Sequence, residues 1–482
     1  MTATHKLIAL FVLLGALPGF ADWPEYRGPW ANGHANAPTD SKPIGLPIHW
    51  SERENVKWKT AIPHLGWSTP VVLGKQIWLT TATADGHDFF AICVDSASGK
   101  IVWSEKVFHS DAPEPLGNKV NCYASPSPVI EPGRVYVHFG SYGTACLDPK
   151  TFKVLWTRTD LPCRHFRGPA SSPILFKNLL ILTLDGIDRQ YLVALDKKTG
   201  RTVWKTDRTA DWNDLNADGR AIGDGDFRKG FGTPFIISAD GGTQMLSVGA
   251  KAAYSYDPAT GRELWKIKTA AHSPAARPLF SRGLALIAAG RGKSEWLALR
   301  VNGRGDLTEA QVAWRTTRNV PQAPSPVLVD DLLFSLTDSG VMCCLEAATG
   351  NEVWQERVGG EYYASVLYGD GNLYCFSQEG KITVLKAGRA FEVRATNTLD
   401  DGFIASPAVA GKALILRTKR IFTASKPPHR RAKAWRAKRT DIGVRPSSSA
   451  EAWGGRFALE FSETSGRADV TAPADGRTSS VW

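Results

Sequence analysis

Residues 194–204 read Ala194-Leu195-Asp196-Lys197-Lys198-Thr199-Gly200-Arg201-Thr202-Val203-Trp204, and this stretch decides the fold. An Asp-x-x-Thr-Gly core follows an apolar residue, and a Trp stands four residues after the Gly. Asp can accept hydrogen bonds from backbone amides in a turn, and Gly accepts positive φ, so the phrase predicts a hairpin. Copies occupy 255–265 and 344–354, and weaker copies end at Trp103, Trp156 and Trp314. The chain is therefore a repeat protein.

The closing Trp recurs at 58, 103, 156, 204, 265, 314 and 354. A period of roughly 40–45 residues with four strands is typical of a propeller blade, and the longer intervals indicate inserted loops. We expect each Trp on the outermost strand of its blade. There its ring can cover the gap to the neighbouring blade and its N–H can find an acceptor.

A second phrase, Ser or a similar residue followed by Pro, marks the start of each innermost strand, where a missing amide donor costs little. Eight starts are present: Ser68-Thr69-Pro70, Ser127-Pro128, Ser172-Pro173, Thr233-Pro234, Arg277-Pro278, Ser325-Pro326, Ser365-Val366 and Ser406-Pro407. Trp58 precedes the first start, whereas the eighth start has no closing strand of its own. We therefore predict an all-β, eight-bladed β-propeller of four-stranded blades, with an N-terminal strand that closes the ring and removes exposed edges.

The N-terminus has the pattern of a signal peptide over 1–21. Lys6 is basic, residues 7–17 are apolar, and Gly19 and Ala21 are small residues at the −3 and −1 positions. The apolar run is shorter than the roughly 20 residues of a spanning helix, which favours cleavage over a membrane anchor. The sequence shows no other stretch that is long and apolar enough. We expect a periplasmic or secreted protein.

The positive charge is unevenly distributed. The formal net charge is +11, but residues 420–482 hold 12 Lys/Arg and 6 Asp/Glu, which leaves only +5 for the remainder. The propeller itself is not markedly basic, so we predict no nucleic-acid partner.

The repeat phrases resemble those of PQQ-like β-propeller repeat proteins, including the outer-membrane assembly factor BamB family. Residues 22–29, Asp22-Trp23-Pro24-Glu25-Tyr26-Arg27-Gly28-Pro29, resemble the mature start of secreted members. The resemblance covers residues 22–419. It implies the fold strongly and the function weakly, because propellers host many activities.

The end of the chain departs from this family. Residues 416–419 are followed by Arg420-Ile421-Phe422-Thr423-Ala424-Ser425-Lys426, where related chains carry a third strand of the type Leu-Tyr-Arg-Ile. We therefore expect the eighth blade to lose its third strand at Lys419, the propeller domain to span 22–419, and 420–482 to be a basic, disordered tail. One permitted coding of 421–426, read two bases later, gives Leu-Tyr-Arg-Ile-Glu, which suggests a frameshift near codon 419. The alternative is a real extension for anionic partners.

Cys343 and Cys344 form a vicinal pair, and quinoprotein dehydrogenases carry a vicinal disulfide beside PQQ. In this chain Cys344 takes the position held in other repeats by Cys93, Cys146, Ala194 and Ser255, which indicates packing. With seven cysteines, at least one thiol stays unpaired within the chain. Cys122 and Cys163 are the candidate bridge.

The segment 214–219 matches the first half of a Ca²⁺ loop, with candidate ligands Asp214, Asn216 and Asp218. The second half does not match, because position twelve is Gly225. A solvated acidic loop is the favoured alternative. Ca²⁺ is thus the one cofactor with candidate ligands, and PQQ is not expected.

The loops before the eight starts should meet at one mouth of the central channel. Their candidate ligand-binding residues are Trp67, Tyr123, His165, Arg167, Phe231, Arg277, Gln322, Tyr363 and Phe403. Aromatic and Arg side chains on a concave mouth suit a planar, sugar-like or peptide ligand. The alternative is that they pack together and fill the funnel. No Ser/His/Asp arrangement or pair of carboxylates points to catalysis.

We therefore expect a monomeric, non-catalytic extracytoplasmic module that binds or scaffolds a protein or polymer partner in the cell envelope, as the resemblance to BamB implies. The alternative is a PQQ- and calcium-dependent quinoprotein oxidoreductase. Such enzymes need a Ca²⁺ site, a catalytic Asp and a Trp that stacks on PQQ, and the sequence assigns none of them. No residues support a lyase or epimerase acting on sugars or polyphenols.

Overall fold

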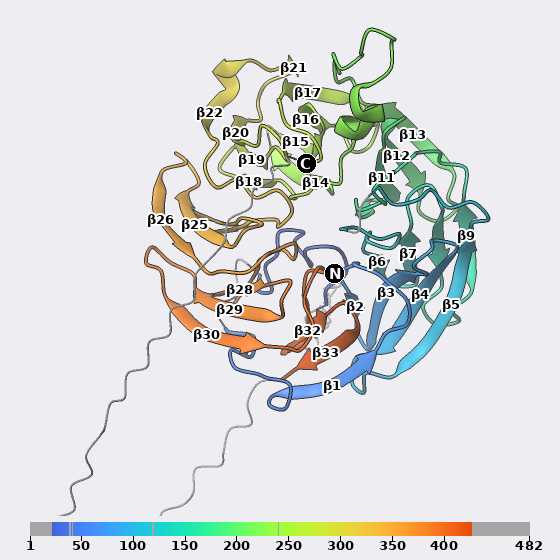
Figure 1. The fold of residues 1–482 in the computed structure, drawn as a ribbon, viewed down its shortest axis with the longest axis vertical. Helices are drawn as coiled ribbons and strands as arrows, with labels where there is room; N and C mark the ends of the chain where they lie inside the picture. Colours follow the sequence, from blue (N-terminus) through green and yellow to red (C-terminus); the bar gives the residue numbers. More distant parts are fainter. Residues whose placement is uncertain (1–21, 38–39, 41, 118–119, 240, 427–482) are drawn as a thin grey trace, which may run out of the picture. The chain divides into compact units, whose positions relative to one another are not determined.

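The computed structural model describes residues 22–37, 40, 42–117, 120–239 and 241–426. The expected signal peptide and the tail from residue 427 onward lie outside the described residues. Eight antiparallel sheets follow one another around a central channel, each running from an inner strand to the rim (Figure 1). The predicted eight-bladed β-propeller is confirmed.

The first four blades use consecutive strands, and the fourth gains a fifth strand, β21, that pairs parallel to β17. Blade 1 holds β2 (Val71–Leu73), β3 (Gln76–Ala82), β4 (Asp88–Asp95) and β5 (Ile101–His109). Blade 2 holds β6 (Val129–Glu131), β7 (Arg134–His138), β8 (Thr144–Leu147) and β9 (Val154–Arg158). Blade 3 holds β10 (Ile174–Phe176), β11 (Leu179–Asp185), β12 (Gln190–Asp196) and β13 (Thr202–Asp207). Blade 4 holds β14 (Phe235–Ala239), β15 (Gly242–Gly249), β16 (Ala252–Tyr256), β17 (Glu263–Lys268) and β21 (Gly305–Asp306).

The other four blades complete the ring, and two short 3₁₀ helices, η1 (Ile222–Arg228) and η2 (Glu309–Gln311), lie in inserted loops. Blade 5 holds β18 (Leu279–Ser281), β19 (Leu284–Ala288), β20 (Trp296–Arg300) and β22 (Val312–Thr316). Blade 6 holds β23 (Val327–Val329), β24 (Leu332–Leu336), β25 (Val341–Glu346) and β26 (Glu352–Arg357). Blade 7 holds β27 (Leu367–Gly369), β28 (Asn372–Phe376), β29 (Lys381–Lys386) and β30 (Val393–Thr398). Blade 8 holds β31 (Ala408–Ala410), β32 (Ala413–Arg417), β33 (Ile421–Ser425) and β1 (Val56–Ala61).

Blade 8 joins the two ends of the propeller and corrects one expectation. The N-terminal strand β1 forms its outer edge, as predicted, with Trp58 opposite Ala424 and Thr60 opposite Phe422. The third strand is not lost at Lys419, because β33 fills that place and pairs with both β32 and β1. Its residues suit a strand: Phe422 and Ala424 are fully buried, and Thr423 is almost so. The propeller therefore extends to Ser425.

Apart from Trp265, the closing Trp residues lie on the outermost strands, as expected. In blade 4 the strand β21 pairs outside β17, and Trp265 Nε1 donates to Gln244 of its own blade at 3.0 Å. Five of the other closing Trp residues donate from Nε1 to a backbone carbonyl of the next blade: Trp58 to Ser96, Trp156 to Lys197, Trp204 to Pro258, Trp314 to Ala347 and Trp354 to Gly388, at 3.0–3.2 Å. Two structural constraints require glycine in the repeat phrase. Gly200 has φ 72°, and a Cβ on it would lie 2.7 Å from the ring of Trp156. Turn conformation and interblade packing therefore both require it.

Small residues are the cross-strand partners of these Trp residues, and this accounts for the presence of Cys344 in the vicinal pair. Cys344 is the cross-strand partner of Trp354, as Cys93 is of Trp103. Cys343 and Cys344 are buried in β25 and carry free thiols, so the packing interpretation holds. The expected bridge between Cys122 and Cys163 is not formed, and all seven cysteines are free. The two sulfurs have different neighbours: Cys122 Sγ lies 3.4 Å from Ser125 Oγ, and Cys163 Sγ lies 3.9 Å from His165 Nδ1.

The hydroxyl residues at the eight starts form a girdle around the channel. The backbone N–H at one start donates to the side-chain hydroxyl at the next: Thr69 to Ser127, Ser127 to Ser172, Ser172 to Thr233, Arg277 to Ser325, Ser325 to Ser365 and Ser365 to Ser406, at 2.9–3.0 Å. A hydroxyl at this position thus links blade to blade. Arg277 takes the place of the hydroxyl in blade 5, and its long side chain reaches across the girdle.

The segment from Trp23 to Arg27 runs across the channel and ties distant blades together. Trp23 forms a bridge with Val72 of blade 1, and the carbonyl of Pro24 accepts from the N–H of Ile130 in blade 2. The Tyr26 hydroxyl lies 3.1 Å from the hydroxyls of both Ser325 and Ser365. Arg27 donates to the carbonyls of Val366 and Pro326 at 2.5 and 2.6 Å. Inner strands that are far apart in the ring therefore share one N-terminal crosslink.

No helix among the described residues is long and apolar enough to cross a membrane.

Candidate functional site

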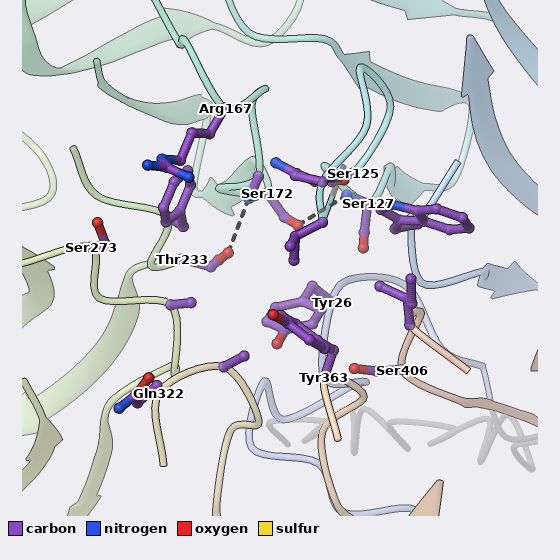
Figure 2. A pocket seen from close by; sticks show the side chains of 18 of the residues that line it. Tyr26, Ser125, Ser127, Arg167, Ser172, Thr233, Ser273, Gln322, Tyr363 and Ser406 are labelled. Atoms are coloured by element: carbon purple, nitrogen blue, oxygen red, sulfur yellow. Dashed lines mark hydrogen bonds between the residues drawn. The ribbon is translucent and has the colours of Figure 1, made fainter. Parts of the chain in front are cut away.

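A cavity of about 360 Å³ opens at the channel mouth, bordered by the hydroxyl girdle (Figure 2). Five of the nine predicted mouth residues line it: Trp67, Arg167, Phe231, Gln322 and Tyr363. They come from the loops before blades 1, 3, 4, 6 and 7, as the repeat predicts. The other four, Tyr123, His165, Arg277 and Phe403, do not line this cavity.

Tyr123 and Phe403 are packing residues. The Tyr123 hydroxyl donates to the carbonyl of Glu114 at 2.9 Å, and its ring meets Phe89 edge-on. Tyr123 is buried but lines a second cavity next to the first. Phe403 is 1% exposed and packs against Phe376 with ring centroids 5.3 Å apart. For these two side chains, the alternative that mouth residues fill the funnel is the better description.

His165 is held inside the protein as a neutral acceptor. Its Nε2 accepts from the backbone N–H of Ser141 at 3.0 Å, which requires an unprotonated Nε2. Burial lowers the pKa of His165 to about 4. A Cβ on Gly140 would collide with this ring, so the close packing of the imidazole depends on glycine there. His165 thus shapes the loop rather than the cavity surface.

Arg277 fixes the N-terminal segment instead of facing the cavity. Its guanidinium donates to the carbonyl of Pro234 at 3.0 Å and to that of Tyr26 at 2.6 Å. The carboxylate of Glu25 lies 3.5 Å away, and the Arg277 side chain is 2% exposed. Desolvation raises the pKa of Glu25 and lowers the pKa of Arg277, while each charge opposes the shift of the other. The charged form of Glu25 is therefore stabilised by Arg277, and the charged form of Arg277 by Glu25.

Arg167 enters the cavity as half of an ion pair. Its Nε and one terminal nitrogen donate to the two carboxylate oxygens of Asp226 at 2.9 and 2.7 Å, and this bidentate geometry fixes the guanidinium plane. The same carboxylate contacts the buried ammonium of Lys229, which also donates to the Asp226 carbonyl at 2.7 Å. One carboxylate is therefore shared by two cations.

A second cation, Arg291, lines the cavity beside His272. The backbones of these two residues pair, and Asp338 lies 3.6 Å from the Arg291 guanidinium. Burial lowers the pKa of His272, and the positive charges of Lys251, Lys229, Arg291 and Arg167 lower it further. Four cations, Arg167, Lys229, Lys251 and Arg291, therefore surround His272.

Sequence reasoning missed several lining residues. The hydroxyls of Thr69, Ser127, Ser172, Thr233 and Ser406 were recognised only as strand starts, although their recurrence was a usable signal. Tyr26 also lines the cavity and lies near Tyr363 across from Arg167 (Figure 2). It comes from the N-terminal segment, and no local pattern in the sequence places it there. Asn121, Asp226 and His272 likewise belong to no repeat position.

The proposed calcium ligands are already engaged within their loop. Both carboxylate oxygens of Asp214 accept from Arg228, at 2.5 and 2.9 Å. Asn216 Oδ1 accepts from the N–H groups of Asp218 and Arg220. Within the described part of the chain, no group of three or more His, Cys, Asp and Glu residues is placed to hold a metal ion. Ca²⁺ binding here stays a prediction, and it would require Asp214 to exchange Arg228 for the ion.

The residues present do not fit PQQ with Ca²⁺. Cys343 and Cys344 are buried free thiols in β25, and neither lines the cavity. Asp226 is the one carboxylate among the described residues that line the cavity, and Arg167 and Lys229 already hold it. Of the Ca²⁺ site, catalytic Asp and stacking Trp that such enzymes need, this mouth offers a candidate Trp, Trp67, but no free carboxylate among the described lining residues.

Solved structures share the fold at low identity. BamB from Moraxella catarrhalis matches with a TM-score of 0.52 and 11% identity, covering 77% of this chain and 99% of its own. A europium-containing methanol dehydrogenase matches with a TM-score of 0.56 and 12% identity, covering 84% and 89%. The computationally designed Ika8 protein matches with a TM-score of 0.51 and 10% identity, covering 76% and 98%. These likenesses show the propeller fold alone.

A comparison with curated proteins found no match. A family model described as outer membrane protein assembly factor BamB matches residues 48–211, 188–324 and 303–480, which together span most of the chain. The repeat phrases, the eight blades and these matches agree. The chain therefore belongs to the PQQ-repeat β-propeller family described as outer membrane protein assembly factor BamB.

Proposed function

We propose that this protein is a non-catalytic, extracytoplasmic binding module that holds part of an envelope protein or polymer in the cavity at its channel mouth. The observation that carries the proposal is the construction of this cavity. Aromatic rings, hydroxyls and amides converge on it from the loops of several blades, and the N-terminal segment adds Tyr26. Concave sites with apolar walls and a few placed polar groups are suited to ligand binding.

The state of the reactive groups supports a binding role rather than a catalytic one. A general base needs a free lone pair within reach of a substrate. His165 is buried with Nε2 engaged, and the carboxylate of Asp226 is held by Arg167 and Lys229. His272 lines the cavity with Nδ1 3.1 Å from Ser273 Oγ, but no carboxylate among the described residues orients this imidazole. A substrate in the cavity would meet donors, acceptors and aromatic faces before it met an activated nucleophile.

The location and the kind of partner are supported by the family. Its description names an assembly factor of the outer membrane, and the N-terminal pattern of the sequence predicts export. The family description and the export pattern are both consistent with a partner in the cell envelope. The protein would act as a monomer, with the ring closed within one chain by β1 and β33.

The second candidate is a quinoprotein oxidoreductase. The fold likeness to a methanol dehydrogenase favours it. The residues at the cavity disfavour it, because they do not fit PQQ with its metal ion.

Two measurements on the purified full chain test the proposal. The first is reconstitution with PQQ and Ca²⁺, or PQQ and a lanthanide ion, followed by absorption spectra and dye reduction with methanol, ethanol or glucose. We expect no bound quinone spectrum and no dye reduction. Metal- and PQQ-dependent dye reduction would contradict the binding role and support the oxidoreductase.

The second measurement compares retention of envelope components by the parent protein and by a double variant, Arg167→Ala with Tyr363→Ala. We expect the double variant to lose the retained component while its melting temperature stays close to that of the parent. Arg304→Ala, on an exposed loop, is the control. Equal retention by both variants would exclude the cavity as the binding site.

A further inference from the structure

A second cavity, which we call the radial groove, lies beside the cavity at the channel mouth. It has about 440 Å³ and lies between the loops of residues 83–85 and 113–116. Trp67 and Asn121 line both cavities, so both spaces border these two side chains. The groove adds apolar surface from Leu65, Leu116 and two prolines, and one exposed carboxylate, that of Asp85, which accepts from Thr83 Oγ1 and the N–H of His87. A ligand that occupied both spaces would be an extended chain that passes Trp67.

Trp67 and Asn121 are held firmly at this junction. The backbone N–H of Trp67 donates to the carbonyl of Ala124 at 3.0 Å. The amide of Asn121 donates toward the carbonyls of Gly168 and Pro169, and its Oδ1 accepts from the N–H of Cys122. Backbone groups of the loops before the next blades therefore hold Trp67 and Asn121 in fixed positions between the cavity and the groove. Side chains that are already fixed lose little conformational entropy when a ligand binds.

The walls of the axial cavity match the surface of a sugar ring. Trp67, Phe231, Tyr26 and Tyr363 supply aromatic surface, and Figure 2 shows the girdle hydroxyls facing the same space. A pyranose has an apolar C–H face that packs on aromatic rings and hydroxyls at its edge that need both donors and acceptors. The girdle hydroxyls, whose oxygens accept from backbone N–H groups, can donate, and the amide of Gln322 can donate and accept.

Trp67 has an unfulfilled hydrogen-bonding requirement. Its Nε1 is buried and has no acceptor among the described residues. Because Nε1 is covered by the protein, a ligand in the cavity meets the indole ring and not its N–H. A sugar ring can pack its apolar C–H face on this surface.

Charge adds a further requirement on the ligand. Arg167 and Lys229 share the carboxylate of Asp226, and Arg291 faces that of Asp338. Desolvation and the charge of Arg167 lower the pKa of Lys229 to about 7, so the cations exceed the carboxylates by less than one full charge at neutral pH. The Arg291 side chain is 40% exposed and contacts its carboxylate only at 3.6 Å, so it can reach a ligand anion.

We propose that the axial cavity and the radial groove together bind an acidic oligosaccharide chain, with a uronate-type carboxylate beside Arg291 and a sugar ring on Trp67. The inference rests on the proposed binding function and names its ligand class. It includes no covalent step.

The test is calorimetry on the purified full chain with defined probes. Galacturonic acid oligomers of one, three and six units are compared with cellohexaose and maltohexaose of equal length. We expect the uronate trimer to bind at least about tenfold more tightly than the monomer, because only an oligomer crosses Trp67. We also expect it to bind more tightly than either neutral hexamer, by a margin that shrinks as salt screens the charge.

Three variants locate the ligand. Trp67→Ala should weaken uronate binding about tenfold or more, and Trp67→Phe should recover part of the loss, because it restores a smaller aromatic ring. Arg291→Gln should weaken the uronate about tenfold and leave neutral probes unchanged. The matched controls are Trp30→Ala, at a Trp that is 37% exposed, and Arg304→Gln. Melting temperatures of all variants identify any that fail to fold.

Each contrary outcome has a separate meaning. Equal affinity for uronate and neutral hexamers would overturn the acidic class. Uronate binding unaffected by Trp67→Ala, Trp67→Phe and Arg291→Gln would overturn the site. No saccharide binding, with an envelope protein still retained through Arg167 and Tyr363, would overturn the ligand class while the proposed binding function stands. PQQ-dependent dye reduction would instead overturn the proposed function itself.

Discussion

The guanidinium of Arg277 donates a hydrogen bond of 2.6 Å to the backbone carbonyl of Tyr26, a residue 251 positions earlier in the chain. At this point in the other blades a hydroxyl or small polar residue links neighbouring blades. In blade 5 an arginine instead reaches across the girdle to the N-terminal segment. Together with the bonds of the Tyr26 hydroxyl to Ser325 and Ser365, this contact holds Tyr26 in the cavity wall, so the shape of the site depends on residues before the first blade.

Replacing Arg277 by Ala should lower the free energy of unfolding by about 3–5 kcal/mol, because it leaves the buried carboxylate of Glu25 without its partner. Urea unfolding followed by tryptophan fluorescence measures the loss. Arg189→Ala, at a side chain that is 57% exposed, is the control and should change stability by less than about 0.5 kcal/mol. Equal effects of the two substitutions would show that the contacts of Arg277 with Glu25 and Tyr26 do not contribute to the free energy of unfolding.

Removing one girdle hydroxyl should destabilise the ring. Ser325 Oγ accepts from the N–H of Arg277 and lies 3.1 Å from the Tyr26 hydroxyl, so Ser325→Ala leaves a buried N–H unpaired. We expect a loss of about 1–3 kcal/mol in the free energy of unfolding. Ser104→Ala, on the outer strand β5, is the matched control. A loss no larger than that of the control would contradict a structural role for the girdle.

Ring closure should depend on β33. Phe422 is fully buried and its ring lies 5.3 Å from that of Trp58, so Phe422→Ala should cost about 3–5 kcal/mol in the free energy of unfolding. Val393→Ala, at a side chain that is 50% exposed on the outer strand β30, should cost far less. Chemical denaturation of both variants decides the matter. A neutral Phe422→Ala would mean that blade 8 does not need its third strand.

Acid should destabilise the propeller through two buried histidines. Burial lowers the pKa of His165 to about 4 and that of His138 to about 3, whereas the ordinary value is 6.5. As the pH falls below 6.5 the unfolded chain takes up these protons first, so stability is lost between pH 6.5 and the folded pKa values. Each histidine contributes a slope of about 1.4 kcal/mol per pH unit in that window. Urea unfolding of the parent and of His165→Gln at pH 7, 6 and 5 should show a shallower slope in the variant, and identical slopes would refute the assignment.

Much of the fold was predictable from the sequence because the repeat is local. A turn phrase, a Trp and a Ser-Pro start recur in most units, and each has a physical reason that acts within a few residues. Even ring closure was predictable, since Trp58 is an unmatched closing residue. The prediction for blade 8 was wrong because residues 421–425 differ from the family phrase. Their β-branched, aromatic and small residues are nevertheless sufficient for a strand that pairs with β32 and β1.

The candidate site was only partly predictable. Trp67, Arg167, Phe231, Gln322 and Tyr363 follow from the repeat, because the loop before each inner strand must reach the mouth. Whether a loop residue then faces the cavity or turns inward depends on its neighbours. Tyr123 and Phe403 find aromatic partners and His165 finds a backbone donor, none of which a repeat position specifies.

The sequence by itself determined the number of blades, the strand that closes the ring and the outer Trp contacts, because these depend on short-range patterns repeated along the chain. Only the tertiary structure decided what the site contains. The crosslink from Arg277 to Tyr26, the sharing of Asp226 by Arg167 and Lys229, and the meeting of two cavities at Trp67 join residues from different blades. Closing the ring brings such residues together, and no local pattern records which of them will meet.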